Sequence, residues 1–330
     1  MEHRMKLHEN KKLFRQAIEF TAQKNGILPI YVEKDYWVTY ALNLIFKDDI
    51  GKDTVFKGGT ALSKCFNAIE RFSEDIDLVV LKKGDETGNQ LSNKIKKMGR
   101  VVSKVLPEVD VEGLTHKMGM NRKTAHAYSK EFKGEFGQIR DTIVIEATWL
   151  GNSEPYTSKQ ICSMVGEMML STGQEIIAQE NGLMPFEVRV LDPKRTICEK
   201  IMSLVRFSYG ENPITDLKNK IRHTYDLHQL LKEKEFFDFL NSPEFDEMLL
   251  KVANDDVASF KNNNAWLVNH PKDALVFDKL EESWEELRTA YNGDFKKLVY
   301  GDLSKESDVL ETLKLIKKRL ASVKWKINFT

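Results

Sequence analysis

Apolar residues recur at helical spacing twice near the start of the chain. Leu13, Phe14, Ala17 and Ile18 lie on one helical face, and residues 36–45 repeat the pattern. The sequence therefore predicts two N-terminal helices, separated by residues 26–30.

The middle of the chain alternates short apolar runs with amphipathic stretches, which is typical of a small unit of strands and helices. The run at residues 76–81 is compact and rich in β-branched side chains, so it predicts a buried strand. The remaining predicted elements are strands at 54–56, 110–114, 139–148 and 186–190, and helices at 60–68, 91–105 and 158–170.

The pattern becomes helical after Asp192-Pro193, a favourable N-cap and first helical residue. We expect helices at 193–207 and 216–231, and further helices from 235 to the end. The predicted fold class is therefore α+β: a small mixed-sheet core flanked by N-terminal helices and a helical C-terminal half. We predict an N-terminal domain at 1–190 and a helical domain at 191–330 that completes the active site.

Charge and cysteine content limit the partners and the cellular compartment that we expect. Lys plus Arg and Asp plus Glu both number 50, so only local patches could hold a polyanion such as RNA. No apolar run approaches the roughly 20 residues that span a bilayer, so we expect no membrane partner. The three cysteines, Cys65, Cys162 and Cys198, follow no metal-ligand spacing, which favours buried free thiols in a reducing cytoplasm.

The chemistry is concentrated in two adjacent motifs. Asp75 and Asp77 open a predicted strand one residue apart, so both carboxylates face the same way and would be stabilised by a divalent cation. Gly58-Gly59-Thr60 lies between a strand and a helix, where a glycine turn and a helix N-terminus can bind phosphate. Either motif alone has an ordinary reading, as a solvated acid pair or a simple turn. Together they predict a phosphate site facing Mg²⁺ or Mn²⁺.

A third carboxylate is expected on a neighbouring strand. Glu146 is the candidate, because it interrupts an otherwise apolar strand and an acid there needs a partner. The alternative is an edge-strand glutamate that faces water.

Five segments resemble one known family in their order along the chain. They are Glu33-Lys34-Asp35-Tyr36, Phe56-Lys57-Gly58-Gly59-Thr60-Ala61-Leu62-Ser63-Lys64, Arg71-Phe72-Ser73-Glu74-Asp75-Ile76-Asp77-Leu78, Arg195-Thr196-Ile197-Cys198-Glu199-Lys200 and Arg222-His223-Thr224-Tyr225-Asp226-Leu227. The stretch resembles the nucleotidyltransferase superfamily and, more narrowly, the AbiEii/AbiGii toxin family of bacterial toxin–antitoxin and phage-defence systems.

The resemblance implies a role for each matching residue. Asp75 and Asp77 match the metal-binding acids, and Gly58, Gly59 and Thr60 match the phosphate-binding turn. Lys57 and Lys200 match basic residues near the nucleotide phosphates. Asp226 matches an acid that helps to order the site, and Ser73 matches a serine that some relatives modify.

Two later features have structural alternatives. Arg222 and Asp226 are spaced i, i+4, so they could form an ordinary helical salt bridge instead of part of the site. Residues 116–133 interleave basic and aromatic side chains, a composition suited to an RNA backbone and an unstacked base, or to a solvated loop.

The leading hypothesis is a toxin-type nucleotidyltransferase. It would transfer a nucleoside monophosphate from an NTP to an RNA acceptor, for which the resemblance suggests a tRNA 3′ end, and an antitoxin protein would be its partner. We predict no DNA partner. One alternative keeps the fold but transfers the γ-phosphate, as a phosphotransferase. The other is a nucleotide- or RNA-binding module without catalysis.

Overall fold

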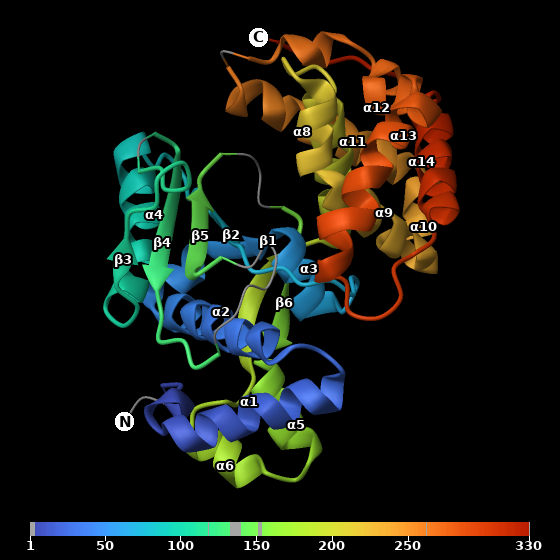
Figure 1. Cartoon of the computed structure of the whole chain (residues 1–330). Helices are drawn as coiled ribbons and strands as arrows, with labels where there is room; N and C mark the ends of the chain where they lie inside the picture. The colour runs from blue at the N-terminus through green and yellow to red at the C-terminus, as the bar shows by residue number, and fades with distance from the viewer. Residues whose placement is uncertain (1–3, 118, 133–139, 151–153, 262, 330) are drawn as a thin grey trace. The chain divides into compact units, whose positions relative to one another are not determined.

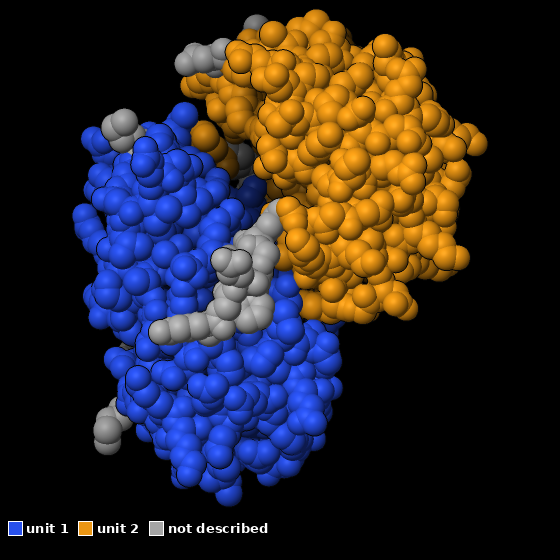
Figure 2. Space-filling view, viewed as in Figure 1, with its two compact units in different colours: residues 1–67, 72–149, 156–190 blue, residues 68–71, 150–155, 191–330 orange. Residues whose placement is uncertain are grey.

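The computed structural model describes residues 4–117, 119–132, 140–150, 154–261 and 263–329. The chain divides into two compact units (Figure 2). Unit 1 comprises residues 1–67, 72–149 and 156–190, and unit 2 comprises residues 68–71, 150–155 and 191–330. The proposed role of the second domain in completing the active site stays a prediction.

Unit 1 begins with the two predicted helices, α1 (Lys11–Asn25) and α2 (Pro29–Lys47) (Figure 1). Asn10 caps α1 by accepting a hydrogen bond from the Leu13 amide at 3.1 Å, and Gly26 ends it in a left-handed conformation. Pro29 occupies the first turn of α2, where its missing N–H is not needed.

Within the described residues, seven strands form one mixed sheet in the order β3-β4-β5-β2-β1-β7-β6. The strands are β1 (Thr54–Lys57), β2 (Ile76–Val80), β3 (Glu108–Val109), β4 (Asn121–Ala127), β5 (Thr142–Thr148), β6 (Tyr156–Ile161) and β7 (Phe186–Leu191). β2 pairs antiparallel with β1 and parallel with β5, which in turn pairs antiparallel with β4. β2 therefore lies at the centre of the sheet, with its neighbours fixed in register.

Successive side chains of the central strands alternate between two faces of the sheet, one packed on the core and one polar. Ile76, Leu78 and Val80 of β2 belong to the same buried cluster as apolar residues of α2 and α4 (Gly88–Ser103). Asp77 lies between them and so projects to the opposite face. The same core contains residues of α5 (Met164–Ser171) and α6 (Glu175–Glu180).

The strand predicted at 110–114 is wrong, because β3 ends at Val109 and the chain turns at Gly113, which has a φ of +72°. The sequence pattern also missed β4, whose residues are mostly polar. β4 is held by its ladders to β3 and β5, a tertiary cause that no local apolar pattern reveals. β5 begins at Thr142, and Ile139 of the prediction lies outside the described residues.

The helix predicted at 158–170 is wrong in its first part. Residues 156–161 form β6 at the end of the strand order, and the helix begins only at Met164. Ser163 explains the boundary, because its hydroxyl accepts a hydrogen bond from the Gly166 amide at 3.1 Å and caps α5.

Unit 2 is helical, as predicted. Its helices are α7 (Pro193–Phe207), α8 (Pro213–Asn219), α9 (Ile221–Lys232), α10 (Lys234–Leu240), α11 (Pro243–Ser259), α12 (Leu275–Asp278), α13 (Leu280–Ala290) and α14 (Glu306–Leu320). The Asp192 side chain caps α7 by accepting from the Lys194 amide at 2.7 Å, which confirms the predicted start. The single helix predicted at 216–231 is instead two, α8 and α9, because Lys220 leaves the helical conformation between them.

The mixed sheet, the preceding helices and the helical C-terminal half together confirm the α+β fold class. All three cysteines are free thiols; Cys162 and Cys198 are buried, whereas Cys65 is partly exposed. Across the part of the chain that the structure describes, no helix is both long and apolar enough to cross a bilayer.

Candidate active site

Gly58-Gly59-Thr60 forms the first turn of α3 (Gly58–Phe66), directly after β1. The N-cap residue is Lys57, whose ammonium can donate but cannot accept, so it cannot cap the amides of that turn. Gly58 has a φ of +79°, and a Cβ built on it would overlap the Asp77 carboxylate. A glycine is therefore required here both for the backbone conformation and for the close approach of Asp77.

The register of the sheet places four charged residues side by side across four strands. Lys57 is opposite Asp77, Asp77 is opposite Glu146, and Glu146 is opposite Lys123. Residues directly opposite each other project to the same face of a sheet. The structure thus brings Asp77 and Glu146 together, as expected of a third acid on a neighbouring strand, between two lysines.

The two central carboxylates have different environments. Burial and the negative charges of Glu146 and Asp75 raise the pKa of Asp77 to about 7. Burial also acts to raise the pKa of Glu146, but a hydrogen bond from Asn121 at 3.0 Å and the charge of Lys123 outweigh it and lower that pKa. The Lys123 ammonium lies 3.2 Å from the Glu146 carboxylate. Of the two acids, Asp77 is therefore the one whose ionised form an added positive charge would stabilise more.

Thr60 ties the glycine turn to the segment that carries Asp75. Its buried hydroxyl donates to the Asp75 carbonyl at 2.6 Å and lies 3.0 Å from the Ser73 hydroxyl. The predicted residue Thr60 thus contacts two others, Ser73 and Asp75, from the first turn of α3.

The Asp75 carboxylate is held by a residue that the sequence did not reveal. The Arg140 guanidinium forms an ion pair with it at 2.5 Å. The Arg140 backbone is fixed from both sides, since its amide donates to Glu74 at 3.0 Å and its carbonyl accepts from Lys34 at 2.6 Å. The Lys34 ammonium also lies 3.2 Å from the Glu74 carboxylate.

Lys34 is the middle of three consecutive charged residues in α2, and each of the three anchors a different segment of unit 1. The Glu33 carboxylate accepts from the amides of Glu131 and Phe132, at 2.7 and 3.1 Å. Asp35 pairs with Lys64 of α3 and accepts from the Met164 amide at 2.7 Å. A signal was present in the sequence, because three consecutive charges within an apolar helix must find buried partners.

The remaining predicted site residues, Lys200 and Asp226, belong to unit 2. The fully buried Asp226 carboxylate accepts two hydrogen bonds from the Arg71 guanidinium, both at 2.6 Å, and one from Lys200 at 2.7 Å. Burial acts to raise the pKa of Asp226, but the charges of Arg71 and Lys200 outweigh it and hold that pKa well below the usual range. Asp226 is thus part of a buried ion cluster with Arg71, a role that the i, i+4 spacing to Arg222 did not suggest.

His223 lies beside this cluster and remains neutral. Burial and the nearby Lys200 ammonium hold its pKa well below the usual value. Its Nδ1 has no hydrogen-bond partner among the residues that the structure describes. The Asp226 carboxylate thus lies between two cations, Arg71 and Lys200, beside a neutral histidine.

Among its described residues, the basic segment at 116–133 does not present the surplus of lysine and arginine charge that RNA binding would use. Its cations are paired with carboxylates: Lys117 with Glu108 and Asp110, Arg122 with Glu108, Lys123 with Glu146, and Lys130 with Asp141. His126 is buried, and Lys133 lies outside the described residues. The RNA-binding role of this segment stays a prediction, and RNA would have to displace these carboxylates.

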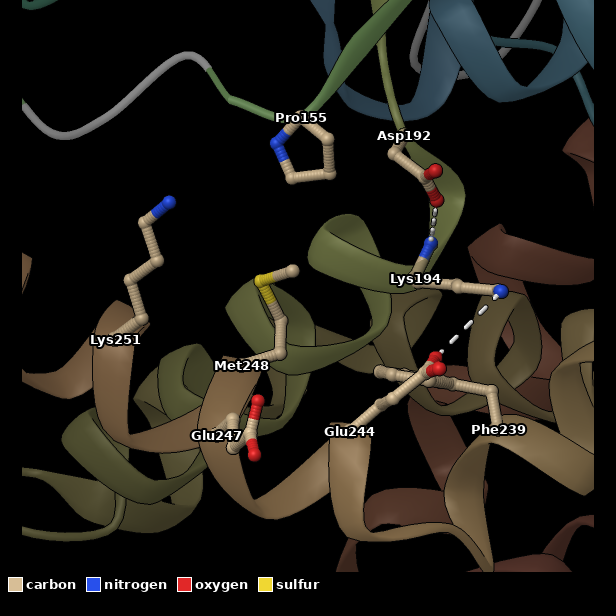
Figure 3. Close-up of a pocket in the computed structure, with 8 residues that line it drawn as sticks. All are labelled: Pro155, Asp192, Lys194, Phe239, Glu244, Glu247, Met248 and Lys251. Atoms are coloured by element: carbon tan, nitrogen blue, oxygen red, sulfur yellow. Dashed lines mark hydrogen bonds and ion pairs between the residues drawn. The ribbon is translucent and has the colours of Figure 1, made fainter.

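Unit 2 contains a separate cavity of about 410 Å³. It is lined by Pro155, Asp192, Lys194, Phe239, Glu244, Glu247, Met248 and Lys251 (Figure 3). The Lys194 ammonium lies over the Phe239 ring, 5.7 Å from its centroid, and 4.0 Å from the Glu244 carboxylate. None of the predicted site residues lines this cavity, and its lining has three acids against two lysines, which does not favour a phosphate. The chemistry therefore points to the sheet of unit 1 instead.

A glycine turn that opens a helix after one strand, with acids on the next two strands, is the arrangement expected of a nucleotidyltransferase. The comparisons agree: a family model described as "Nucleotidyl transferase AbiEii toxin, Type IV TA system" matches residues 42–314. The chain belongs to this family of nucleotidyltransferase toxins, and it is a nucleotidyltransferase.

Comparison with curated proteins gives no match. Among solved structures, the chain is similar to MenT4, a nucleotidyltransferase toxin from Mycobacterium tuberculosis H37Rv. The two share 15% sequence identity with a TM-score of 0.45, and the similarity covers 91% of this chain and 98% of that one.

Proposed function

We propose that this chain transfers a nucleoside monophosphate from an NTP to an RNA acceptor, at a site built on Asp75, Asp77 and Glu146. The observation that supports the proposal most strongly is the position of Asp77 between Gly58 and Glu146. Its carboxylate lies against Gly58 at the start of α3, and Glu146 is its neighbour in the sheet. Phosphate-binding amides and paired acids are therefore side by side.

The donor chemistry at this position fits Mg²⁺ or Mn²⁺. Carboxylate oxygens are the ligands that these ions prefer. Burial, together with the charges of Glu146 and Asp75, raises the pKa of Asp77, so a cation placed beside these acids would stabilise the ionised form. Among the described residues, no three acidic, histidine or cysteine side chains converge as a ready-made metal site. Asp77 and Glu146 would hold the ion, joined by Asp75 once its carboxylate is released from Arg140.

When bound, the cation supplies positive charge to the triphosphate oxygens. The residues of the chain do the rest. The amides of the first α3 turn bind the phosphates, helped by the helix dipole and by Lys57 at the end of β1. Thr60 fixes this turn to the Asp75 segment, so that phosphates and acids keep their relative positions.

In the transfer step, an acceptor hydroxyl oxygen forms a bond to the α-phosphorus. The bond from that phosphorus to the oxygen bridging to the β-phosphate breaks, pyrophosphate leaves, and the hydroxyl proton passes to solvent. We infer that positioning and charge stabilisation supply most of the rate, because this step needs no covalent intermediate with the enzyme.

We extend the proposal to the partners that a type IV toxin implies. The acceptor is an RNA, with the tRNA 3′ end as our choice, and a cognate antitoxin protein neutralises the activity. The catalytic roles of Lys200 and Asp226 rest on the family resemblance, and their ion pair at 2.7 Å holds the Lys200 ammonium in place.

Labelled nucleotides test the reaction class. The chain is incubated with total bacterial tRNA, Mg²⁺ and each NTP in turn, labelled at either the α- or the γ-phosphate. We expect the α-label to appear in RNA and the γ-label to appear only in pyrophosphate. Transfer of the γ-label to RNA or to Ser73 would instead establish a phosphotransferase, and nucleotide binding without any transfer would indicate a binding module.

A further inference from the structure

Arg140 occupies a distinctive position at the proposed metal site. It is the residue whose guanidinium contacts Asp75, at 2.5 Å, while Asp77 and Glu146 lie next to each other in the sheet. The Arg140 side chain is 36% exposed and that of Asp75 is 25% exposed, so this ion pair is accessible to solvent.

The backbone and the side chain of Arg140 are held very differently. Its amide and carbonyl are fixed by Glu74 and Lys34, both of which are buried. Lys34 also donates to the Thr142 carbonyl at 2.6 Å, which fixes the start of β5. The guanidinium, by contrast, is held mainly by Asp75, and its distance to the Glu74 carboxylate is 3.7 Å. The anchor point is therefore rigid, whereas the charged end can exchange partners.

We propose that Arg140 is the resident counter-ion of Asp75, and that it exchanges Asp75 for the nucleotide phosphates when a divalent cation binds. The inference rests on the proposed function, because it assumes that Asp75 and Asp77 bind the metal. Without the metal, the guanidinium neutralises Asp75 and limits repulsion among Asp75, Asp77 and Glu146. With the metal, that task passes to the cation.

The released guanidinium then has a suitable new partner nearby. The first turn of α3 is joined to the Asp75 backbone through Thr60, so phosphates bound there are close to the residue that Arg140 leaves. Arginine binds phosphate in a bidentate manner and is preferred for that purpose over a point charge. Arg140 is thus a positioning residue in the empty site and a phosphate-binding residue in the loaded one.

The exchange predicts two effects of opposite sign for Arg140→Gln. Without nucleotide, Mn²⁺ should bind about three- to tenfold more tightly than to the wild type, because a competing ion pair of partly exposed groups is gone. With saturating Mn²⁺, the α,β-methylene analogues of the four NTPs should bind about tenfold more weakly, because a phosphate contact is lost. A loss of structure alone would weaken both.

Mn²⁺ binding is measured from the electron paramagnetic resonance signal of the unbound ion, and analogue binding by calorimetry. Arg140→Lys keeps the charge and should stay within about twofold of the wild type for Mn²⁺. Arg15→Gln is the matched control, because Arg15 forms an exposed pair with Glu19 at 3.0 Å in the same unit, and it should change neither affinity.

The outcomes separate this inference from the proposed function. If the wild type binds Mn²⁺, Asp77→Ala loses it, and Arg140→Gln binds it no more tightly, the exchange is refuted and the metal site stands. Unchanged analogue binding by Arg140→Gln would likewise refute the transfer of Arg140 to phosphate. If the wild type itself takes up no Mn²⁺, both proposals fall.

Discussion

Gly58→Ala tests the close packing of the glycine turn against Asp77. Gly58 has a φ of +79°, so an alanine there adopts an unfavourable left-handed conformation, at a cost of about 1–2 kcal/mol. The new Cβ would also overlap the Asp77 carboxylate, and relieving such overpacking typically costs about 1–3 kcal/mol more. We therefore expect a total loss of about 2–5 kcal/mol in the free energy of unfolding.

Gly173→Ala is the matched control for the cost of placing an alanine in a left-handed backbone conformation. Gly173 lies between α5 and α6 with a φ of +74°, and a Cβ added there meets no atom within 4 Å. It should lose only about 1–2 kcal/mol, so the difference between the two variants isolates the collision with Asp77. Urea unfolding measures both values, with the slope on urea concentration checked for constancy.

Activity should separate the two variants further. Displacement of Asp77 by about an ångström should lower nucleotidyl transfer about a hundredfold in Gly58→Ala, whereas Gly173→Ala should match the wild type. The assay follows α-labelled NTP into total tRNA under conditions where both variants are folded. Equal losses of stability in the two variants, together with full transfer by Gly58→Ala, would refute the packing of Asp77 against this turn.

Two further predictions follow from the buried cluster and from the family. Asp226→Asn should lower the free energy of unfolding, measured in urea, by about 3–5 kcal/mol, because it leaves Arg71 and Lys200 as buried cations around a neutral amide. The control is Asp278→Asn at an exposed position, which should cost less than about 0.5 kcal/mol. Equal effects of the two substitutions would show that the cluster does not stabilise unit 2. Expression of the wild-type gene should arrest bacterial growth, whereas expression of the Asp75→Ala gene should not, as judged by growth curves at matched protein levels. If neither gene slows growth, the prediction of toxicity in that host is wrong.

The sequence predicted the elements that carry strong local signals. Asp192-Pro193 defined the start of α7, and the apolar run beginning at Ile76 defined β2. The proximity of Glu146 to Asp77 was also anticipated, because an acid within an apolar strand must be close to a partner.

The features that the sequence missed depend on contacts between distant segments. β4 is mostly polar, and its ladders with β3 and β5 make it a strand. The partner of Asp226 is Arg71, 155 residues away, although Arg222 is at helical spacing. Arg140 and Asp75 are likewise 65 residues apart. Local patterns can show that a buried charge needs a partner, but they cannot show which residue it is.

The central claim is that the acids beside the glycine turn perform nucleotidyl transfer. It is tested most directly by the rate at which α-label from NTP enters total tRNA, compared among the wild type, Asp75→Ala and Asp77→Ala, with circular dichroism as the control for folding. Charge stabilisation by a bound metal is worth several kcal/mol, so both variants should lose about a hundredfold or more while remaining folded. Transfer at nearly the wild-type rate by either folded variant would contradict the claim.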